Sequence, residues 1–447
     1  MTVVTARTRP VTCASGQRQG VTPWTPVSVD SGSQPRPTSP RDAGSALPVV
    51  AMIGGGQLAR MTHQAAIELG QCLRVLSGGP DEPAAQVSAN VVLGSHTDLD
   101  ALREVAVGSA ALTFDHEHVP TEHLDVLVSE GVNVQPPPQA LIHAQDKLVM
   151  RRTLDELGAP VPAFAEVTSV ADVEAFGNEH GWEVVIKAVR GGYDGRGVWM
   201  PSGADEAAAI VTAQLGQGVD LMVEQKVPMR RELSAMVARS PFGQGASWPV
   251  VETVQREGQC AVVIAPAPDL SAELAAQAEE LALRISSALG ATGAMAVELF
   301  ETVDGDLVVN ELAMRPHNSG HWTQDGARTS QFEQHLRAVL DYPLGDPSSI
   351  APVTVMANVL GAPEAPAMSM DERLHHLFAR MPDAKVHMYG KGERKDRKIG
   401  HVNVVGDASG SLDDAGYVAA VRERAERAAH WLSHGEWTDG WDPHTGN

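Results

Sequence analysis

Short apolar runs alternate along this chain with longer stretches in which apolar residues recur at every third or fourth position. The short runs predict buried strands, and the longer stretches predict amphipathic helices. In the first third of the chain the predicted strands are 48–53, 72–76, 91–93, 110–114 and 132–134, with helical patterns between them. Strands that alternate with helices are typical of a parallel sheet, so we predict an N-terminal parallel α/β domain.

The pattern changes after residue 145. A helix is predicted over 146–157, where Gly158 and a nearby proline end it. The elements predicted beyond it are strands at 183–189, 198–200, 221–227, 233–238 and 248–264 and helices at 205–215 and 271–289. The fold class is therefore α/β, with a strand-rich second region.

A β-hairpin is predicted where two alternating apolar runs, 294–302 and 306–312, flank an Asp-Gly pair at 304–305. A two-residue turn at that pair puts Glu298 opposite Glu311. Residues opposed in this way have Cβ atoms about 4.5–5.5 Å apart, and like charges at that distance destabilise a sheet. A divalent cation such as Mg²⁺ would make the pair favourable, whereas a solvated pair of carboxylates is the plainer interpretation.

Polar side chains follow this hairpin closely. Within a few positions of its end come Arg315, His317, Asn318, Ser319, His321 and Trp322. A cluster of hydrogen-bonding groups so dense suits an anionic ligand better than a hydrophobic core. The hairpin and this segment together form the first candidate site.

Two glycine-rich segments follow predicted strands. Gly54, Gly56 and Ala59 fit the G-x-G-x-x-A pattern that places a phosphate at a helix N-terminus. The acidic residue that would hold a dinucleotide's ribose is missing after the next strand, so a dehydrogenase is only a second-rank interpretation. The second segment, 190–197, has four glycines and follows Lys187, which suits a mobile phosphate-binding loop, although a long hairpin turn has similar composition.

Other charged positions allow more than one interpretation. The backbone of 224–227 can act as a hinge that reads an adenine edge, with Glu232 accepting ribose hydroxyls, or this is an ordinary pair of strands with charged ends. The segment 115–118, Asp-His-Glu-His, together with His123, suggests zinc. A polar strand end beside a ligand cleft is the better interpretation, because His116 and Glu117 point to opposite faces of a strand.

Composition bounds the function further. At 447 residues the chain is long enough for about three domains, and its net charge of −22 argues against nucleic-acid and anionic-membrane binding. No apolar stretch approaches the roughly 18–20 residues that span a bilayer. Three scattered cysteines, Cys13, Cys72 and Cys260, fit a reducing cytoplasm. One basic cluster stands out, at Lys391, Arg394, Lys395, Arg397 and Lys398.

Residues 1–47 are rich in Ser, Thr, Pro and Gly and are expected to be disordered. An arginine-bearing, acid-poor leader of this kind suits a transit peptide, but an inert tail or a start codon placed too early is the preferred interpretation.

The order of these features resembles the ATP-grasp enzymes: a lysine on a strand, a glycine-rich loop, an adenine hinge, then paired glutamates on a late hairpin. Within them the chain is similar to the 5-(carboxyamino)imidazole ribonucleotide synthase family. The motifs that carry the resemblance are GGGQLARM (54–61), GGYDGRG (191–197), NELAMRPHNSGHWT (310–323), QFEQHLRAVL (331–340) and RKIGHVN (397–403). The resemblance implies a pre-ATP-grasp domain at 48–142, a two-part ATP-grasp domain at 143–345 and a small C-terminal domain at 346–447.

The resemblance also implies residue roles. ATP would be bound by Lys147, Lys187, Gly192, Tyr193, Asp194, Gly195, Arg196, Gly197, Val198, Glu224, Gln225, Lys226, Val227, Glu232, Asn310 and Glu311. Mg²⁺, or Mn²⁺, would be bound by Glu298 and Glu311. Catalytic roles would fall to Lys187, Arg315, His317 and Asn318. The aminoimidazole ribonucleotide would be bound by Gly56, Gln57, Tyr193, Asp194, Arg196, Lys391 and Lys398.

The implied activity is ATP-dependent carboxylation of 5-aminoimidazole ribonucleotide with bicarbonate, through carboxyphosphate, in a cytoplasmic homodimer. Some positions depart from the family pattern: Lys147 replaces a common arginine, Met314 a usual proline, Gln255 a frequent histidine and His116 an aromatic residue. The nearest alternative is another ATP-grasp ligase, such as a formate-dependent ribonucleotide formyltransferase. An NAD(P)-dependent dehydrogenase and a nucleotide-binding regulator without turnover are alternatives from other classes.

Overall fold

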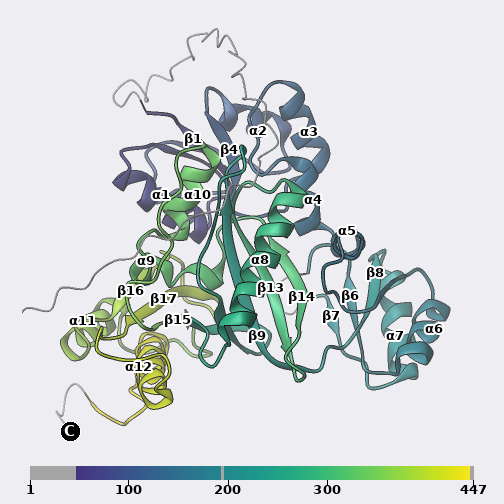
Figure 1. Ribbon diagram of the computed structural model, residues 1–447. Helices are drawn as coiled ribbons and strands as arrows, with labels where there is room; N and C mark the ends of the chain where they lie inside the picture. Colours follow the sequence, from purple (N-terminus) through teal and green to yellow (C-terminus); the bar gives the residue numbers. More distant parts are fainter. Residues whose placement is uncertain (1–46, 193–195, 443–447) are drawn as a thin grey trace, which may run out of the picture. The chain divides into compact units, whose positions relative to one another are not determined.

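The computed structural model describes residues 47–192 and 196–442 of the chain, and these form a mixed α/β fold with three sheets (Figure 1). The predicted disorder of the leader falls on residues that lie almost wholly outside the described part. Within that part no helix has both the length and the apolar character that crossing a membrane requires.

The N-terminal sheet is parallel, as predicted, with strand order β3-β2-β1-β4. Its elements are β1 (Val50–Ile53), α1 (Gln57–Glu68), β2 (Leu73–Ser77), β3 (Val91–Leu93), α2 (Leu99–Ala106), β4 (Ala111–Phe114), α3 (Thr121–Ser129) and α4 (Pro138–Gln145). The predicted strand at 132–134 is wrong, because only Val134 makes an isolated bridge to Leu112. Three prolines follow at 136–138, and a residue without an N–H cannot extend a ladder.

A small antiparallel sheet follows, with strand order β5-β8-β6-β7. Its elements are α5 (Lys147–Glu156), β5 (Phe164–Val167), α6 (Val170–His180), β6 (Val184–Ala188), β7 (Val198–Trp199), α7 (Ala204–Leu215) and β8 (Leu221–Gln225). Helices α6 and α7 pack on this sheet around Val173, Phe176 and Val211, which are almost fully buried. The opposite side of the sheet is thus available to line a cleft.

The largest sheet runs β14-β13-β9-β11-β12-β15-β17-β16, with β10 paired to β9. Its strands are β9 (Met229–Arg239), β10 (Gly245–Ser247), β11 (Val251–Arg256), β12 (Gln259–Ala265), β13 (Gly293–Thr302), β14 (Leu307–Ala313), β15 (Thr354–Leu360), β16 (Lys385–Met388) and β17 (Lys398–Val405). Its helices are α8 (Ala272–Leu289), η1 (Asn318–Gly320), α9 (Thr323–Gly326), α10 (Gln331–Val339), α11 (Met370–Arg380) and α12 (Ala415–His434). The C-terminal strands thus extend the central sheet.

Strand β9 begins at Met229, four residues before the predicted start of the strand at 233–238. Its first residues pair with the outer end of β13. The pairing shifts register once, between Glu301 and Thr302, and then continues into the apolar part of the strand, so the charged residues here lie on a sheet.

The β13–β14 hairpin places Glu298 directly opposite Glu311, as predicted, but it reaches this register by a different route. The turn is a three-residue loop at 303–305 closed between Thr302 and Asp306, and Gly305 has φ +88°. The longer loop shifts the pairs between the turn and Leu299 by one residue from the predicted register. A β-bulge at Asn310 then shifts the pairing back, so the two-residue turn was wrong and the carboxylate pair was right.

Candidate active site

A cleft of about 1060 Å³ opens between the small sheet, the central sheet and the carboxyl edge of the N-terminal sheet. Most of the predicted site residues line it: Gln57, Lys147, Lys187, Gly192, Val198, Glu224, Gln225, Lys226, Val227, Glu232, Glu298, Asn310, Glu311, Arg315, His317, Asn318 and Lys398. Segments that are far apart in the sequence therefore meet around one cavity large enough for a nucleotide and a second small molecule.

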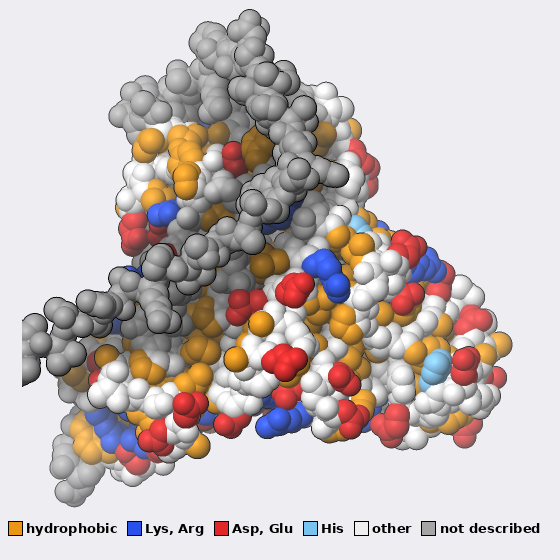
Figure 2. Space-filling model, in the orientation of Figure 1, with side chains coloured by type: hydrophobic (Ala, Val, Ile, Leu, Met, Phe, Trp, Pro, Cys, Tyr) orange, Lys and Arg blue, Asp and Glu red, His pale blue; other side chains and the backbone are white. Residues whose placement is uncertain are grey.

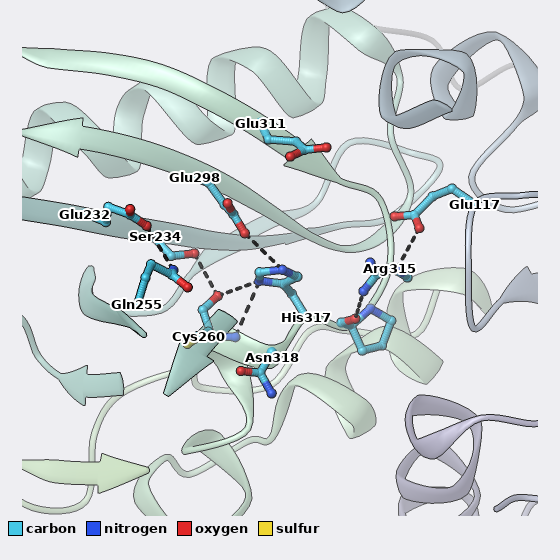
Figure 3. Close-up of polar contacts among 12 residues, drawn as sticks. Glu117, Glu232, Ser234, Gln255, Cys260, Glu298, Glu311, Arg315, His317 and Asn318 are labelled. Atoms are coloured by element: carbon cyan, nitrogen blue, oxygen red, sulfur yellow. Dashed lines mark hydrogen bonds and ion pairs between the residues drawn. The ribbon is translucent and has the colours of Figure 1, made fainter. Parts of the chain in front are cut away.

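The two carboxylates lie in one row of residues that crosses three strands. Glu311 pairs with Glu298, and Glu298 pairs on its other side with Ser234 of β9. In Figure 3 Glu298 points towards His317, whose Nε2 is 3.1 Å from Glu298 Oε1. Lys147 forms an ion pair with Glu311. Each carboxylate thus has a partner on a different element.

This donor set fits Mg²⁺. Among the described residues, no group of three or more His, Cys, Asp or Glu side chains is arranged to hold a metal ion. The described residues therefore do not form a site in which protein ligands alone surround a metal ion, as they do in a structural zinc site. Mg²⁺ usually binds through one or two carboxylates and fills its other positions with phosphate oxygens and water, which is what Glu298 and Glu311 can provide.

A buried ion triad closes the floor of the cleft. Glu224 lies 2.6 Å from Arg151 Nε and 2.7 Å from Lys187 Nζ. Burial alone would raise the pKa of Glu224, but Arg151 and Lys187 together hold this pKa below its ordinary value. Burial lowers the pKa of Lys187, against the opposing effect of Glu224. The triad fixes the lysine in place at the small sheet.

The triad also explains the bulge in the hairpin. Asn310 is the extra residue, and its carbonyl accepts a 2.7 Å hydrogen bond from Arg151. Its side-chain oxygen lies 3.4 Å from Lys187 Nζ. Arg151 was not among the predicted residues. It follows Lys147 by four positions on α5, so the i,i+4 spacing that places both on one helix face could have indicated it.

The predicted adenine hinge lies along the edge of the cleft. The N–H groups of Gln225 and Lys226 donate to Ala163 and Glu183, so they are used by the sheet. Glu232 accepts a 2.9 Å hydrogen bond from Gln255 (Figure 3). Burial, with a smaller effect of the nearby Glu298 charge, raises the pKa of Glu232. Gln255 therefore contacts the carboxylate that sequence reasoning assigned to the ribose.

Arg315 reaches across to the N-terminal sheet, where its Nε lies 2.7 Å from Glu117 Oε2. Burial raises the pKa of Glu117, but Arg315 outweighs it and keeps the pKa low. Glu117 was not predicted to take part. The signal for it was its place in the polar segment 115–118, which directly follows β4.

The first glycine segment binds a carboxylate of the chain itself. Asp115 accepts hydrogen bonds from the N–H groups of Gly56 and Ala59 at the start of α1. A Cβ at Gly56 would lie 2.2 Å from Asp115 Oδ2, so glycine is required there by this approach. The strand, turn and helix were predicted, but the helix N-terminus holds an aspartate.

Several predicted substrate residues lie near the cleft without lining it: Gly56, Arg196, Gly197 and Lys391. Lys391 donates a hydrogen bond to Gln57 and so joins the basic cluster to the start of α1. Tyr193, Asp194 and Gly195 lie outside the described residues. Figure 2 shows Asp and Glu side chains spread over the visible face, with Lys and Arg in smaller groups.

The imidazole rings of His96, His116 and His118 pack against one another. His116 stacks on His118, with ring centroids 5.4 Å apart, and meets His96 edge-on at 4.6 Å. Burial, with smaller effects of His96 and His118, lowers the pKa of His116 to about 4. This agrees with the interpretation of a polar strand end beside the cleft.

Comparison with known proteins identifies the domain families of the chain. The ATP-grasp domain family matches residues 152–332, the ribonucleotide synthetase pre-ATP-grasp domain family 47–145, and the phosphoribosylaminoimidazole carboxylase C-terminal domain family 354–415. The fold and the cleft therefore define an ATP-grasp enzyme.

Relatives with similar sequences show which family of ATP-grasp enzymes the chain belongs to. An N5-carboxyaminoimidazole ribonucleotide synthase of Mycobacterium tuberculosis is 65% identical over 89% of this chain and 90% of its own length. That of Corynebacterium ammoniagenes is 53% identical over 88% and 94%. The chain belongs to the N5-carboxyaminoimidazole ribonucleotide synthase family.

Solved structures of this family have the same fold as this chain. The synthetase from Thermus thermophilus has a TM-score of 0.75 at 35% identity and covers 88% of this chain and 100% of its own. An Aspergillus clavatus synthase in complex with ADP and 5-aminoimidazole ribonucleotide has a TM-score of 0.76 at 30% identity and covers 85% and 99%.

Proposed function

We propose that this protein catalyses the ATP-dependent carboxylation of 5-aminoimidazole ribonucleotide with bicarbonate, giving N5-carboxyaminoimidazole ribonucleotide, ADP and phosphate in purine biosynthesis. The observation that carries the proposal is the row of Glu298 and Glu311 on the central sheet, which faces the same cleft as Lys187 and Lys398. One cavity thus offers carboxylates for a cation, a lysine for nucleotide phosphates and a separate basic group for a second ligand.

The nucleotide binds between the two antiparallel sheets. The segment 224–227 contacts adenine through its backbone, and Glu232 accepts the ribose hydroxyls. Lys147, Lys187 and the loop 192–198 bind the phosphates, and the loop's glycines allow close approach of backbone N–H groups. Asn310 lies beside them. Lys147 leaves Glu311 for the nucleotide when the nucleotide enters.

Glu298 and Glu311 would hold Mg²⁺, with Mn²⁺ as a substitute. When bound, the cation neutralises charge on the transferring phosphoryl group and orients it. The chain's own contribution is to keep these carboxylates in register and to exclude water, because phosphoryl transfer depends on positioning and charge more than on covalent help.

Bicarbonate is a poor electrophile, so it is first phosphorylated by ATP to carboxyphosphate with release of ADP. The exocyclic amine of the ribonucleotide then bonds either to the carboxyl carbon of carboxyphosphate or to CO₂ released from it. In both cases phosphate leaves with the electron pair of the broken C–O bond, and the amine loses a proton. Arg315, His317 and Asn318 contact the bicarbonate and phosphate oxygens. Arg315 is held for this by Glu117.

The ribonucleotide lies between the start of α1 and the C-terminal strands. Its phosphate contacts Lys391 and Lys398, and the remaining groups contact Gly56, Gln57, Tyr193, Asp194 and Arg196. A basic cluster on a chain of net charge −22 has a clear use in binding a phosphate. We further propose a cytoplasmic homodimer with domain boundaries near residues 142 and 345.

The test is ADP formation by the full chain with ATP, Mg²⁺ and 5-aminoimidazole ribonucleotide, with either bicarbonate or formate. We expect ADP in proportion to carboxylated product with bicarbonate only. Formate-dependent ADP formation would favour the formyltransferase, and binding of NAD(P)H in a fluorescence titration without ADP formation would favour a dehydrogenase. Either result would refute the proposed activity.

A further inference from the structure

Most of the basic cluster lies on one short loop, residues 390–397, between β16 and β17. The loop is closed at its base, where the Tyr389 N–H donates to the Ile399 carbonyl at 2.9 Å. Both lysines proposed to bind the ribonucleotide phosphate depend on its conformation, because Lys391 is on the loop and Lys398 directly follows it. The contacts that hold this loop therefore determine where the two ammonium groups lie.

Both ends of the loop are tied to neighbouring segments. At the first end the Gln86 side-chain amide donates to the Gly390 carbonyl at 2.8 Å. At the other end the Gly361 N–H donates to the Arg397 carbonyl at 2.9 Å, and the Asp396 N–H donates to the Gly361 carbonyl at 3.0 Å. These bonds fix the ends and leave the middle of the loop to other contacts.

The middle of the loop is held from outside by a buried arginine. Arg373 of α11 is 1% exposed, and its Nη2 lies 2.6 Å from Glu393 Oε1. A hydrogen bond between two charged groups is roughly twice as strong as one between neutral groups. The pair therefore joins the loop to α11 more firmly than the neutral amide of Gln86 joins it to the N-terminal region.

Arg373 is itself fixed on its other side. Its Nη1 donates to the carbonyls of Leu432 and Ser433 in the last turn of α12, where the helix dipole favours a cation. The Arg373 carbonyl accepts a 2.7 Å hydrogen bond from Trp431 Nε1, and α11 lies beside α12 (Figure 1). The guanidinium is thus a fixed point, and the loop is the part that gains order from the ion pair.

We propose that Arg373 and Glu393 are positioning residues, which hold the loop 390–397 so that Lys391 and Lys398 meet the phosphate of the ribonucleotide. Both act through the lysines and not on the substrate itself. The inference rests on the proposed function for the identity of that phosphate, but the anchoring of the loop is a property of the protein without substrate.

The sign of a substitution effect separates positioning from simple electrostatics. Glu393 lies two residues from Lys391, so its negative charge by itself opposes the binding of a phosphate. If the carboxylate acts only through this charge, Glu393→Ala should lower KM for the ribonucleotide. Because we infer that it holds the loop, we expect this KM to rise by about 10-fold, in the range that loss of one charge-assisted hydrogen bond produces. Both kcat and KM for ATP should stay within about twofold of wild type.

Glu423→Ala is the matched control, because it removes one charge and one ion pair, with Arg427, from an exposed position on α12. It should leave all three constants unchanged. A KM for the ribonucleotide that is unchanged or lowered in Glu393→Ala would overturn the proposal.

The second test is made without substrates. Hydrogen exchange of the full chain is followed by mass spectrometry in peptides that cover 389–398, where the amide hydrogens of Tyr389, Asp396 and Arg397 are bonded. We expect exchange there to be about 10-fold faster in Glu393→Ala than in wild type, and unchanged in peptides of α8. Equal exchange of the loop in both proteins would overturn the proposal. Absence of bicarbonate-dependent ADP formation by the wild type would refute the proposed function instead, and the exchange result would stand apart from it.

Discussion

Two of the regions in which polar side chains are buried differ in how they bury charge. In the cleft, buried carboxylates meet buried cations: Glu224 contacts Arg151 and Lys187, and Glu117 contacts Arg315. Where α10 packs between the N-terminal and central sheets, fully buried His335 instead contacts only neutral groups, with Thr113 Oγ1 at 2.8 Å and the Ala294 N–H at 3.0 Å.

The difference shows what each region is for. Burial lowers the pKa of His335 to about 3, so it stays uncharged and joins two sheets through hydrogen bonds. The cleft keeps its groups charged at the cost of desolvation, which is offset only where opposite charges are close. The cleft thus keeps charge where a charged ligand binds, whereas the contact of α10 with the two sheets at His335 is polar without being ionic.

The largest expected effect comes from removing one charge from the cleft. Glu311→Gln keeps the size of the side chain but removes a carboxylate opposite Glu298, so we expect turnover to fall by about 10³-fold or more, in the range found when one transition-state contact is lost. Steady-state ADP formation measures this.

Asp304→Asn is the matched control, because it removes one charge from the exposed tip of the same hairpin. It should leave turnover unchanged. Wild-type turnover in Glu311→Gln would show that the carboxylate pair has no role in the reaction.

The next effect is on stability. Arg151→Met leaves Glu224 with Lys187 alone and the Asn310 carbonyl without its donor, so the free energy of unfolding should fall by about 3 kcal/mol. Urea unfolding measures this change. The neighbouring Arg152→Met breaks only an exposed pair with Glu166 and should have no measurable effect. Equal stability of the two variants would mean that the triad does not support the hairpin.

A smaller effect on stability is expected at His335, where the buried side chain is uncharged. The pKa of His335 is lower in the folded than in the unfolded chain, so the unfolded chain binds more protons and stability is lost as pH falls below about 6.5. Between pH 6.5 and pH 5 this amounts to about 2 kcal/mol. Urea unfolding at both pH values measures this change. The free energy of unfolding of His335→Gln should fall between pH 6.5 and pH 5 by about 2 kcal/mol less than that of the wild type.

His375→Gln, at an exposed position on α11, is the control and should lose as much stability on acidification as wild type does. If His335→Gln behaves in the same way as this control, the histidine is not the buried neutral group that the hydrogen bonds indicate.

The comparison also shows which features the sequence could predict. The alternation of apolar residues was enough to predict most of the strands, because a pattern of period two is local. The pairing of Glu298 with Glu311 was predicted from a two-residue turn that does not form, and it is correct because the bulge at Asn310 compensates for the longer loop. The bulge was not predictable, since it depends on Arg151, which satisfies the carbonyl of Asn310 from a distant helix. Likewise the glycines at the start of α1 were recognised, but their partner Asp115 lies 59 residues away.

The smallest expected effect is at the tip of that hairpin, where the prediction of the turn failed. Gly305 has φ +88°, a conformation that costs a residue with a Cβ about 1 kcal/mol, and no atom lies within 4 Å of the Cβ position. Gly305→Ala should therefore lower the free energy of unfolding by about that amount, measured by urea unfolding. Turnover should be unchanged, because the bulge at Asn310 and its bond to Arg151 set the register of the carboxylates independently of the turn. A loss of turnover similar to that of Glu311→Gln would show that the turn, and not the bulge, aligns the two glutamates.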